Sequence, residues 1–184
     1  MPRISLPALL TLIVFASTAR AQFSIYGTVA ATDYGYAFNS GGLTYNGDYL
    51  GLGGGLTYIF PRDRRLTLGI DLRDYVTPAA RGGNTGVVSF RIGVVPHKVP
   101  LRPYFQIGPG YVSAKVPAVV GPQTVDIAAV SIGGGLDIRV ARHIDLRVIE
   151  IESTAGVSAT QSAGTASFGT GVVYHLQAAR PTNP

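Results

Sequence analysis

Apolar and polar positions alternate strictly along residues 101–112. One phase is apolar or aromatic and includes two prolines: Leu101, Pro103, Phe105, Ile107, Pro109 and Tyr111. The other is polar or small: Arg102, Tyr104, Gln106, Gly108 and Gly110. A period of two predicts a β-strand with one apolar and one polar face. The length is about twice that of an ordinary globular strand and fits a tilted strand that crosses a bilayer in roughly 9–11 residues.

The same alternation marks eight segments along the chain, at residues 23–32, 49–60, 65–76, 86–95, 101–112, 127–140, 144–151 and 165–176. Short connections follow the even segments (61–64, 96–100, 141–143), and long ones follow the odd segments (33–48, 77–85, 113–126, 152–164). Outer-membrane barrels have short periplasmic turns and longer outer loops, and an even strand number closes the sheet without a free edge. The pattern predicts an all-β fold, an eight-stranded antiparallel up-and-down transmembrane β-barrel with short periplasmic turns and longer extracellular loops.

Periodicity alone does not say which face points outward, because a lipocalin-like soluble barrel alternates in the same way with its apolar face inside. The polar phase combines charges with many glycines, among them Gly53, Gly69 and Gly133. Glycine weakens a strand and contributes nothing on a solvated face, whereas in a narrow lumen it makes room for long arginines. The polar face is therefore predicted to be the inside, and the lipocalin-like barrel remains the less favoured alternative.

Charged residues in the polar phase form a predicted lumen charge network: Arg65, Asp71, Arg73, Arg91, Arg102, Asp137, Arg139, Asp145, Arg147 and Glu150. The alternation breaks at residues 149–151, so a β-bulge is needed to return Glu150 to the lumen. Charges removed from water need partners, which favours an ion-pair plug. The alternative is a narrow, porin-like path for anions.

The N-terminus has the pattern of a secretory signal. Met1-Pro2-Arg3 is followed by an apolar run at 6–16 and by Ala19-Arg20-Ala21, which predicts a signal peptide at 1–21. Its removal takes Arg3 and Arg20 and lowers the formal charge from +5 to +5 − 2 = +3. This charge does not favour nucleic acid as a partner. The domains expected are then a barrel at 22–176 and a short polar tail at 177–184.

Two compositional features narrow the class further. Only 14% of the residues are charged, against about 25% in a typical soluble domain, which fits an apolar exterior. The chain has no cysteine, so disulfides, thiolate metal sites and lipid anchoring are excluded.

Several stretches resemble the bacterial outer-membrane β-barrel domain family, the small OmpA/OmpX-type barrels. They are residues 102–111 (RPYFQIGPGY), 133–139 (GGGLDIR), 145–148 (DLRV) and 167–174 (SFGTGVVY). The resemblance implies an outer-membrane location, no catalytic residues and no cofactor. It implies outer-membrane lipid, lipopolysaccharide and the barrel-assembly machinery as partners. Such barrels usually end at an aromatic residue, whereas here Tyr174-His175-Leu176 is followed by the polar tail.

Aromatic residues suggest two further sites. Phe23, Tyr58, Phe60 and Tyr174 are predicted to lie at the periplasmic membrane interface, where amphipathic rings anchor barrels. The 33–48 connection carries Tyr34, Tyr36, Phe38 and Tyr45 with glycine and asparagine, a composition that suits a recognition surface for an extracellular ligand.

Histidines and serines are the remaining candidates for chemistry. His97, His143 and His175 are predicted at one rim, but no carboxylate spacing supports zinc, so no metal site is expected. Ser24, Ser89, Ser131, Ser167 and His175 form no hydrolase motif, so the protein is not expected to be an enzyme. The sequence predicts an integral outer-membrane protein with a structural or interaction role. A narrow solute channel and an outer-membrane lipid-modifying enzyme are the alternatives. No peptidoglycan-binding domain is expected.

Overall fold

The computed structural model describes residues 22–38, 44–60, 65–78, 83–96, 99–116, 123–157 and 161–176. The predicted signal peptide at 1–21, His97 and the polar tail at 177–184 lie outside these ranges. Within the described ranges, no helix is long and apolar enough to span a membrane.

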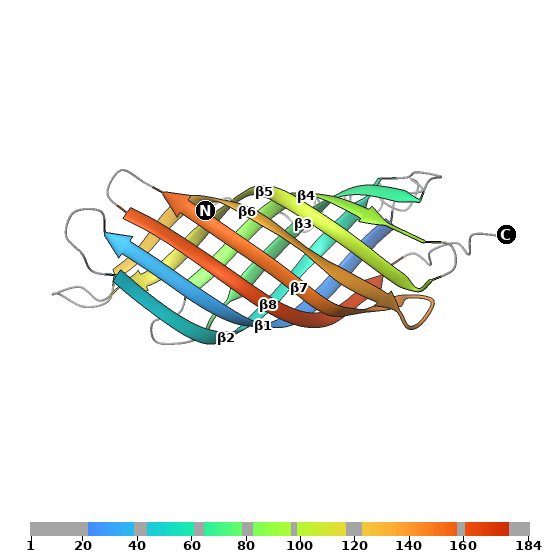
Figure 1. The fold of residues 1–184 in the computed structure, drawn as a ribbon, viewed down its shortest axis with the longest axis horizontal. Helices are drawn as coiled ribbons and strands as arrows, with labels where there is room; N and C mark the ends of the chain where they lie inside the picture. The colour runs from blue at the N-terminus through green and yellow to red at the C-terminus, as the bar shows by residue number, and fades with distance from the viewer. Residues whose placement is uncertain are drawn as a thin grey trace, which may run out of the picture.

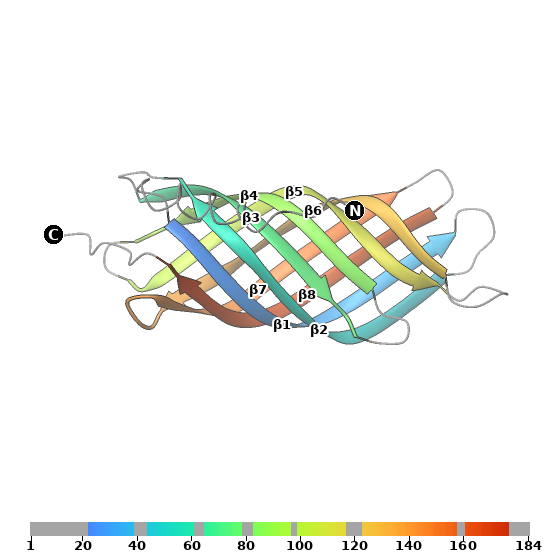
Figure 2. The same cartoon turned by 180° about the vertical axis from the view of Figure 1, so that it is seen from behind.

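Eight strands make up the fold: β1 (Gln22–Phe38), β2 (Thr44–Ile59), β3 (Leu66–Val76), β4 (Gly83–Val94), β5 (Leu101–Val116), β6 (Gln123–Arg139), β7 (Ile144–Val157) and β8 (Gln161–His175). Each strand pairs antiparallel with the next, and β8 pairs with β1 to close the barrel (Figures 1 and 2). The predicted eight-stranded antiparallel barrel is confirmed. We call the end where β1 begins and β8 ends the lower end, and the opposite end the upper end.

The register fixes how strongly the strands tilt. Following paired residues once around the barrel from Tyr26, through Gly55, Arg73, Val87, Gly110, Ala129, Gly156 and Ala163, leads back to β1 at Tyr36. The stagger is 36 − 26 = 10 residues, so the strands run obliquely, as Figure 1 shows. Eight strands enclose a lumen just wide enough for side chains to fill.

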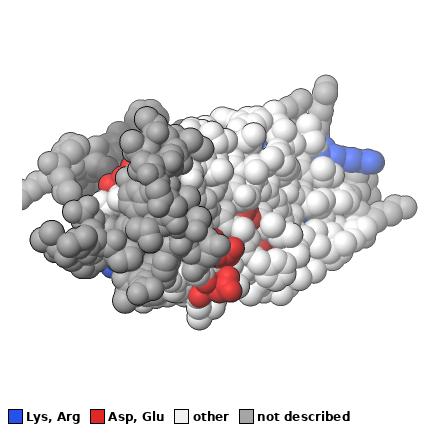
Figure 3. Space-filling model, turned by 60° about the vertical axis from the view of Figure 1, so that its left-hand side comes forward, with Lys and Arg blue, Asp and Glu red and all other residues white. Residues whose placement is uncertain are grey.

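Apolar side chains point outward and polar ones inward, as the alternation predicts. Large apolar residues form an outward-facing band that we call the belt: Ile25, Val29, Leu50, Leu52, Leu56, Leu66, Ile70, Leu72, Val76, Val88, Phe90, Ile92, Val94, Phe105, Ile107, Tyr111, Val130, Ile132, Ile144, Leu146, Val148, Ile151, Phe168, Val172 and Tyr174. Figure 3 shows this wall as largely uncharged, with acidic side chains at its left part and basic ones at its right end.

Strands extend further at the upper end than the hydrophobic pattern predicts. The 33–48 connection is mostly strand, because β1 continues to Phe38 and β2 begins at Thr44. Asp33 and Asp48 are paired and exposed above the belt, so the apolar alternation stops there while the strand pairing continues. Together with Lys115 and Asp126, two further exposed residues near the upper end, they form what we call the collar.

The β-bulge predicted in the seventh segment is present, at Val148–Ile149. On the β6 side, Leu136 pairs with Ile149 while the next residue, Asp137, pairs with Arg147. The register also shifts on the β8 side, between Arg147 and Glu150. The extra residue brings Glu150 into the lumen, where it is 1% exposed.

Candidate functional site: the lumen charges and the lower rim

Glu150 lies at the centre of a group of charges that crosses the lumen. Its Oε1 is 2.9 Å from Nη1 of Arg73 on β3 and 3.0 Å from Nη1 of Arg147 on β7. The hydroxyls of Tyr104 and Tyr75 donate to its two oxygens at 2.6 and 2.7 Å. Four donors from three strands therefore converge on one carboxylate, and they tie opposite walls of the barrel together.

A second carboxylate, Asp71, is held in the same way. It accepts from the Tyr26 hydroxyl at 2.8 Å, from Thr57 Oγ1 at 2.7 Å and from Arg73 Nε at 2.9 Å. Arg73 also pairs with Glu152, which accepts from Ser131 Oγ at 2.7 Å. One guanidinium thus joins three acidic side chains.

Asp137 closes the group on the other side. It pairs with Arg147 Nε at 3.0 Å and with Arg91 Nη2 at 2.8 Å. The linked charged residues form what we call the inner cluster: Asp71, Arg73, Arg91, Asp137, Arg147, Glu150 and Glu152. Arg147 and Asp71 are 0% exposed, a burial that charges tolerate only when they are paired.

Tyrosine rings fill the space between the guanidinium groups. The Arg91 guanidinium carbon lies 3.5 Å from the centroid of Tyr104, and that of Arg147 lies 4.3 Å from the centroid of Tyr26. These stacks pack planar cations against aromatic faces and add cation–π attraction in a site shielded from water.

A separate hydrogen-bonded chain lies at the lower end, on β1, β8, β7 and β5. Ser24 Oγ is 2.7 Å from His175 Nδ1, and His175 Nε2 is 2.9 Å from Asp145 Oδ2. Arg102 Nη1 is 2.8 Å from the same Asp145 oxygen. We call these four residues the rim chain. Ser24 and His175 are also direct cross-strand partners.

The upper part of the lumen is apolar instead. Tyr34, Val112, Ile127, Ala129 and Ala163 form a buried cluster there. Tyr34 was predicted to lie in a recognition loop, but it is an inward residue of β1, 5% exposed, whose hydroxyl donates to the Gly83 carbonyl at 3.0 Å. It points inward because β1 continues as a strand through this position.

The other predicted recognition residues, Tyr36, Phe38 and Tyr45, have their backbones in β1 and β2, where Tyr36 pairs with Tyr45. Their side chains lie outside the described part of the structure.

Two of the predicted lumen arginines lie outside the inner cluster and the rim chain. Arg65 is exposed in the bend before β3, because the strand begins one residue later. Arg139 is at the lower end of β6, where it pairs in register with the inward Asp145 and its Nη2 lies 3.4 Å from the Arg142 carbonyl. The remaining eight predicted charges fall in the inner cluster or in the rim chain.

Sequence reasoning missed Glu152, which was placed in a long connection, and the inward tyrosines Tyr26 and Tyr75. Tyr104 was assigned to the polar phase but not to the charge network. The signal for the tyrosines is their place in the polar phase of their strands, where a large ring has to fill the lumen.

The predicted interface aromatics gather near the lower end. The rings of Phe23 and Tyr58 are 5.0 Å apart, and those of Tyr58 and Phe60 are 5.3 Å apart. Tyr174 stacks on His143 at 6.0 Å. His143 and His175 share the lower end, joined by a 2.9 Å contact between His143 Nδ1 and the His175 carbonyl. The described residues contain no group of ligands that would hold a metal.

No protein-family model matches the sequence. No curated protein sequence matches it either. Among solved structures, Neisserial surface protein A (NspA) is similar at 12% identity and a TM-score of 0.51, covering 82% of this chain and 96% of that one. The fold is that of a small outer-membrane β-barrel. The predicted resemblance to the OmpA/OmpX-type barrels is confirmed at the level of the fold.

Two further barrels agree. Ail, the attachment invasion locus protein of Yersinia pestis, has 11% identity and a TM-score of 0.50, covering 82% of this chain and 98% of that one. A major outer membrane protein from Thermus thermophilus has 10% identity and a TM-score of 0.51, covering 85% and 100%. At these identities the likeness concerns the fold alone.

Proposed function

We propose that the protein is an integral outer-membrane barrel with a structural or interaction role and a lumen sealed by the inner cluster. In this proposal residues 1–21 direct export, the barrel-assembly machinery inserts the chain, and the belt contacts lipid and lipopolysaccharide. The lower end faces the periplasm and the collar faces outward. The belt supports the location in the membrane, because a band of exposed apolar side chains is costly in water and favourable in lipid.

The observation that carries the sealed lumen is the arrangement around Glu150. An ion that passed this level would have to separate Glu150 from Arg73 and Arg147, each of which is almost fully buried. Breaking a buried pair leaves an uncompensated charge, which costs about 3–5 kcal/mol. The barrier disfavours steady conduction.

Planar-bilayer recording tests the seal. We expect no large, stable conductance steps from the wild-type barrel. The double variant Arg147→Ala/Glu150→Ala removes both a cation and its acceptor from the inner cluster, and we expect brief openings from it. Stable wild-type steps would contradict the seal and support the alternative, a narrow solute channel.

The interaction role is assigned to the upper end. There β1 and β2 stay paired beyond the collar residues Asp33 and Asp48, and they carry Tyr36 and Tyr45 on paired backbone positions. We expect the double variant Tyr36→Ser/Tyr45→Ser to lower binding of whole cells to a glycan or cell-surface array, with Asp48→Asn as the control. Unchanged binding would remove these tyrosines from the proposal.

A second candidate, a lipid esterase, is favoured by one observation, the order Ser24–His175–Asp145 in the rim chain. With Nε2–H directed at Asp145, the free Nδ1 of His175 can take the Ser24 proton as Oγ attacks an ester carbonyl. The alcohol then leaves with that proton, and water releases the acyl group from Ser24. Ser24 is only 3% exposed, so a substrate has little access to it. We therefore rank the esterase function below the structural role.

A fluorophosphonate probe separates the two interpretations of the rim chain. An esterase predicts labelling of the wild type and none of Ser24→Ala or His175→Ala. If the wild type is not labelled, and a heat-modifiability gel shows that it is folded, the rim chain contributes to stability alone.

A further inference from the structure

The carboxylate of Asp74 points outward from the barrel, unlike the charges of the inner cluster. On β3 the side chains of Arg73 and Tyr75 are buried in the lumen, whereas Asp74 between them is exposed on the outer wall. Leu72 and Val76, two residues to either side on the same strand, belong to the belt. Asp74 therefore lies within the belt and not beyond it.

The belt continues above Asp74 on β2, whereas on β4 the outward residue above Gly86 is the exposed Asn84. Val76 pairs with Leu52 on β2, and Leu50, which is 68% exposed, lies further up that strand. The collar aspartates Asp33 and Asp48 come only above Leu50. An ionisable side chain surrounded in this way by lipid-facing residues is costly, and such residues in membrane proteins usually mark a functional site.

The wall around Asp74 is hollowed. Its cross-strand partners are Gly54 on β2 and Gly86 on β4, neither of which has a side chain. Gly86 pairs in turn with Tyr111 on β5, and a Cβ at Gly86 would meet the Tyr111 ring. The Tyr111 ring therefore lies over Gly86, on the side of β4 that faces Asp74 on β3.

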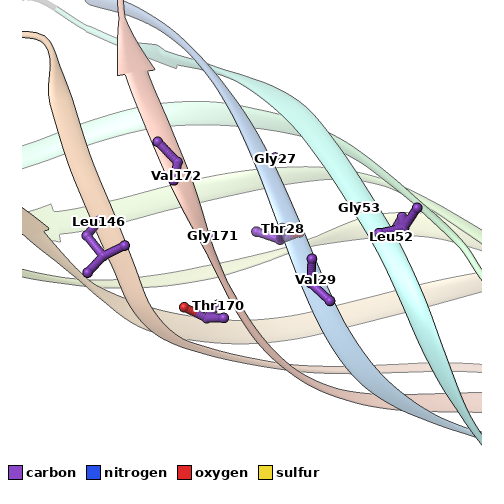
Figure 4. Close-up of a pocket in the computed structure, with 9 residues that line it drawn as sticks. All are labelled: Gly27, Thr28, Val29, Leu52, Gly53, Leu146, Thr170, Gly171 and Val172. Atoms are coloured by element: carbon purple, nitrogen blue, oxygen red, sulfur yellow. The ribbon is translucent and has the colours of Figure 1, made fainter.

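These residues border an open groove of about 560 Å³ on the outer wall, whose apolar floor includes Leu56, Leu72 and Val88. A second groove of about 480 Å³, at Gly27 and Val172, lacks any charged residue (Figure 4). Both grooves are therefore bordered by glycines, but only the groove with Asp74 and Tyr111 has a carboxylate on the outer wall.

Asp74 takes part in none of the ion pairs or hydrogen bonds of the described residues. A carboxylate accepts hydrogen bonds and does not donate them, so its ligand has to bring N–H or O–H donors, and a cationic N–H donor forms the stronger bond. The described belt carries no outward lysine or arginine of its own.

We propose that Asp74 and Tyr111 form a binding site for the primary ammonium group of a lipid headgroup, with an acyl chain lying along Leu72, Leu56 and Val88. The inference rests on the proposed membrane location of the barrel. Asp74 lies close to the upper edge of the belt, within reach of headgroups, while the apolar floor continues toward the middle of the belt. An anionic headgroup without an amine is repelled by the carboxylate.

Ethanolamine and choline lipids provide a matched pair of probes. Both headgroups are zwitterionic, but only the ethanolamine ammonium has N–H donors for Asp74. The chain contains no tryptophan, so one introduced tryptophan reports local lipid contact through quenching by brominated lipids. Leu52→Trp places the reporter beside Val76 and between the two grooves, because Leu52 borders the second groove and is two residues from Gly54 in the first. Ile151→Trp on β7 places it on another part of the wall.

The protein is isolated from bacterial membranes and reconstituted into phosphatidylcholine vesicles with brominated phosphatidylethanolamine or brominated phosphatidylcholine. With the Leu52→Trp reporter we expect relative association of the ethanolamine lipid to exceed that of the choline lipid by up to about fivefold, the upper limit for an exposed ion pair. The ratio should fall to about one in Asp74→Asn and should persist in the collar control Asp48→Asn. The Ile151→Trp reporter should show a ratio of about one throughout.

A ratio of one at Leu52→Trp, or a preference that survives Asp74→Asn, overturns the amine site. Equal binding of both lipids that depends on Tyr111 but not on Asp74 also overturns it, in favour of aromatic contact alone. Heat-modifiability of each variant separates these outcomes from failure of the barrel. If the wild type does not insert into vesicles at all, the proposed membrane location fails first.

Discussion

Arg147 Nη1 and Glu150 Oε1 lie 3.0 Å apart in the lumen, although the two residues are three positions apart on one strand. In a regular strand, residues with this spacing point to opposite faces. The β-bulge at Val148–Ile149 removes the conflict, because it inserts one residue and turns Glu150 inward. The inner cluster therefore depends on an irregularity of the backbone as well as on its charges.

Two deletions test this dependence. Deletion of Ile149 removes the extra residue, so Arg147 and Glu150 become two positions apart and share the lumen face of a regular strand. We expect this variant to keep the gel shift of a folded barrel on refolding into vesicles. Deletion of both Val148 and Ile149 makes Arg147 and Glu150 adjacent, so one of them faces lipid, and we expect the gel shift to be lost. The same behaviour of the two deletion variants would contradict the role of the bulge.

Removal of the Glu150 carboxylate should be strongly destabilising. Glu150→Ala leaves Arg73 and Arg147 short of an acceptor and deprives the Tyr75 and Tyr104 hydroxyls of theirs. We expect a loss of about 3–5 kcal/mol in the free energy of unfolding, measured by urea titration in lipid vesicles. Glu150→Gln keeps an acceptor oxygen and should lose less. A loss below about 1 kcal/mol for the alanine variant would show that the cluster is not cooperative.

Tyr104 makes two separable contributions. Tyr104→Phe removes the 2.6 Å hydrogen bond to Glu150 but keeps the ring under the Arg91 guanidinium, 3.5 Å from its centroid. We expect a loss of about 1.5–3 kcal/mol, the range for a hydrogen bond to a charged group. Tyr104→Leu should cost about 0.5–2 kcal/mol more through the lost cation–π contact. Equal unfolding free energies for the two variants would exclude an energetic role for the stack.

Two glycines of opposite orientation should respond differently to alanine. A Cβ at the inward Gly53 would meet the Tyr75 ring and Thr28, whereas one at the outward Gly27 has no atom within 4 Å. Overpacking of this kind costs about 1–3 kcal/mol. We therefore expect Gly53→Ala to unfold at lower urea than the wild type and Gly27→Ala to unfold close to it. The same loss in both variants would contradict overpacking at Gly53 as the cause.

Alternation alone predicts most of the fold, because in a barrel the lipid face and the lumen face select opposite residue types at every step. The pattern fails where lipid no longer makes that selection. Above the belt, Asp33 is outward and polar while Tyr34 is inward and aromatic, so a paired strand resembles a loop in sequence.

The candidate sites are harder to predict for the same kind of reason. Ser24, Asp145 and His175 are far apart in the chain, and only the closure of β8 on β1 joins Ser24 to His175. Asp74 comes three residues after Asp71 and one after Arg73. It differs from these lumen charges only because it falls in the apolar, outward phase of the alternation. That phase is visible in the sequence, whereas the glycine hollow beside it depends on cross-strand register.

Heat-modifiability after refolding into lipid vesicles tests the central claim, an apolar exterior for lipid around a paired, charged interior. The chain is unfolded in urea, diluted into vesicles, and compared on detergent gels with and without boiling. We expect the unboiled protein to resist detergent and to migrate differently from the boiled protein. A chain that stays soluble without lipid and never shifts would contradict the claim and mean that the apolar face belongs inside.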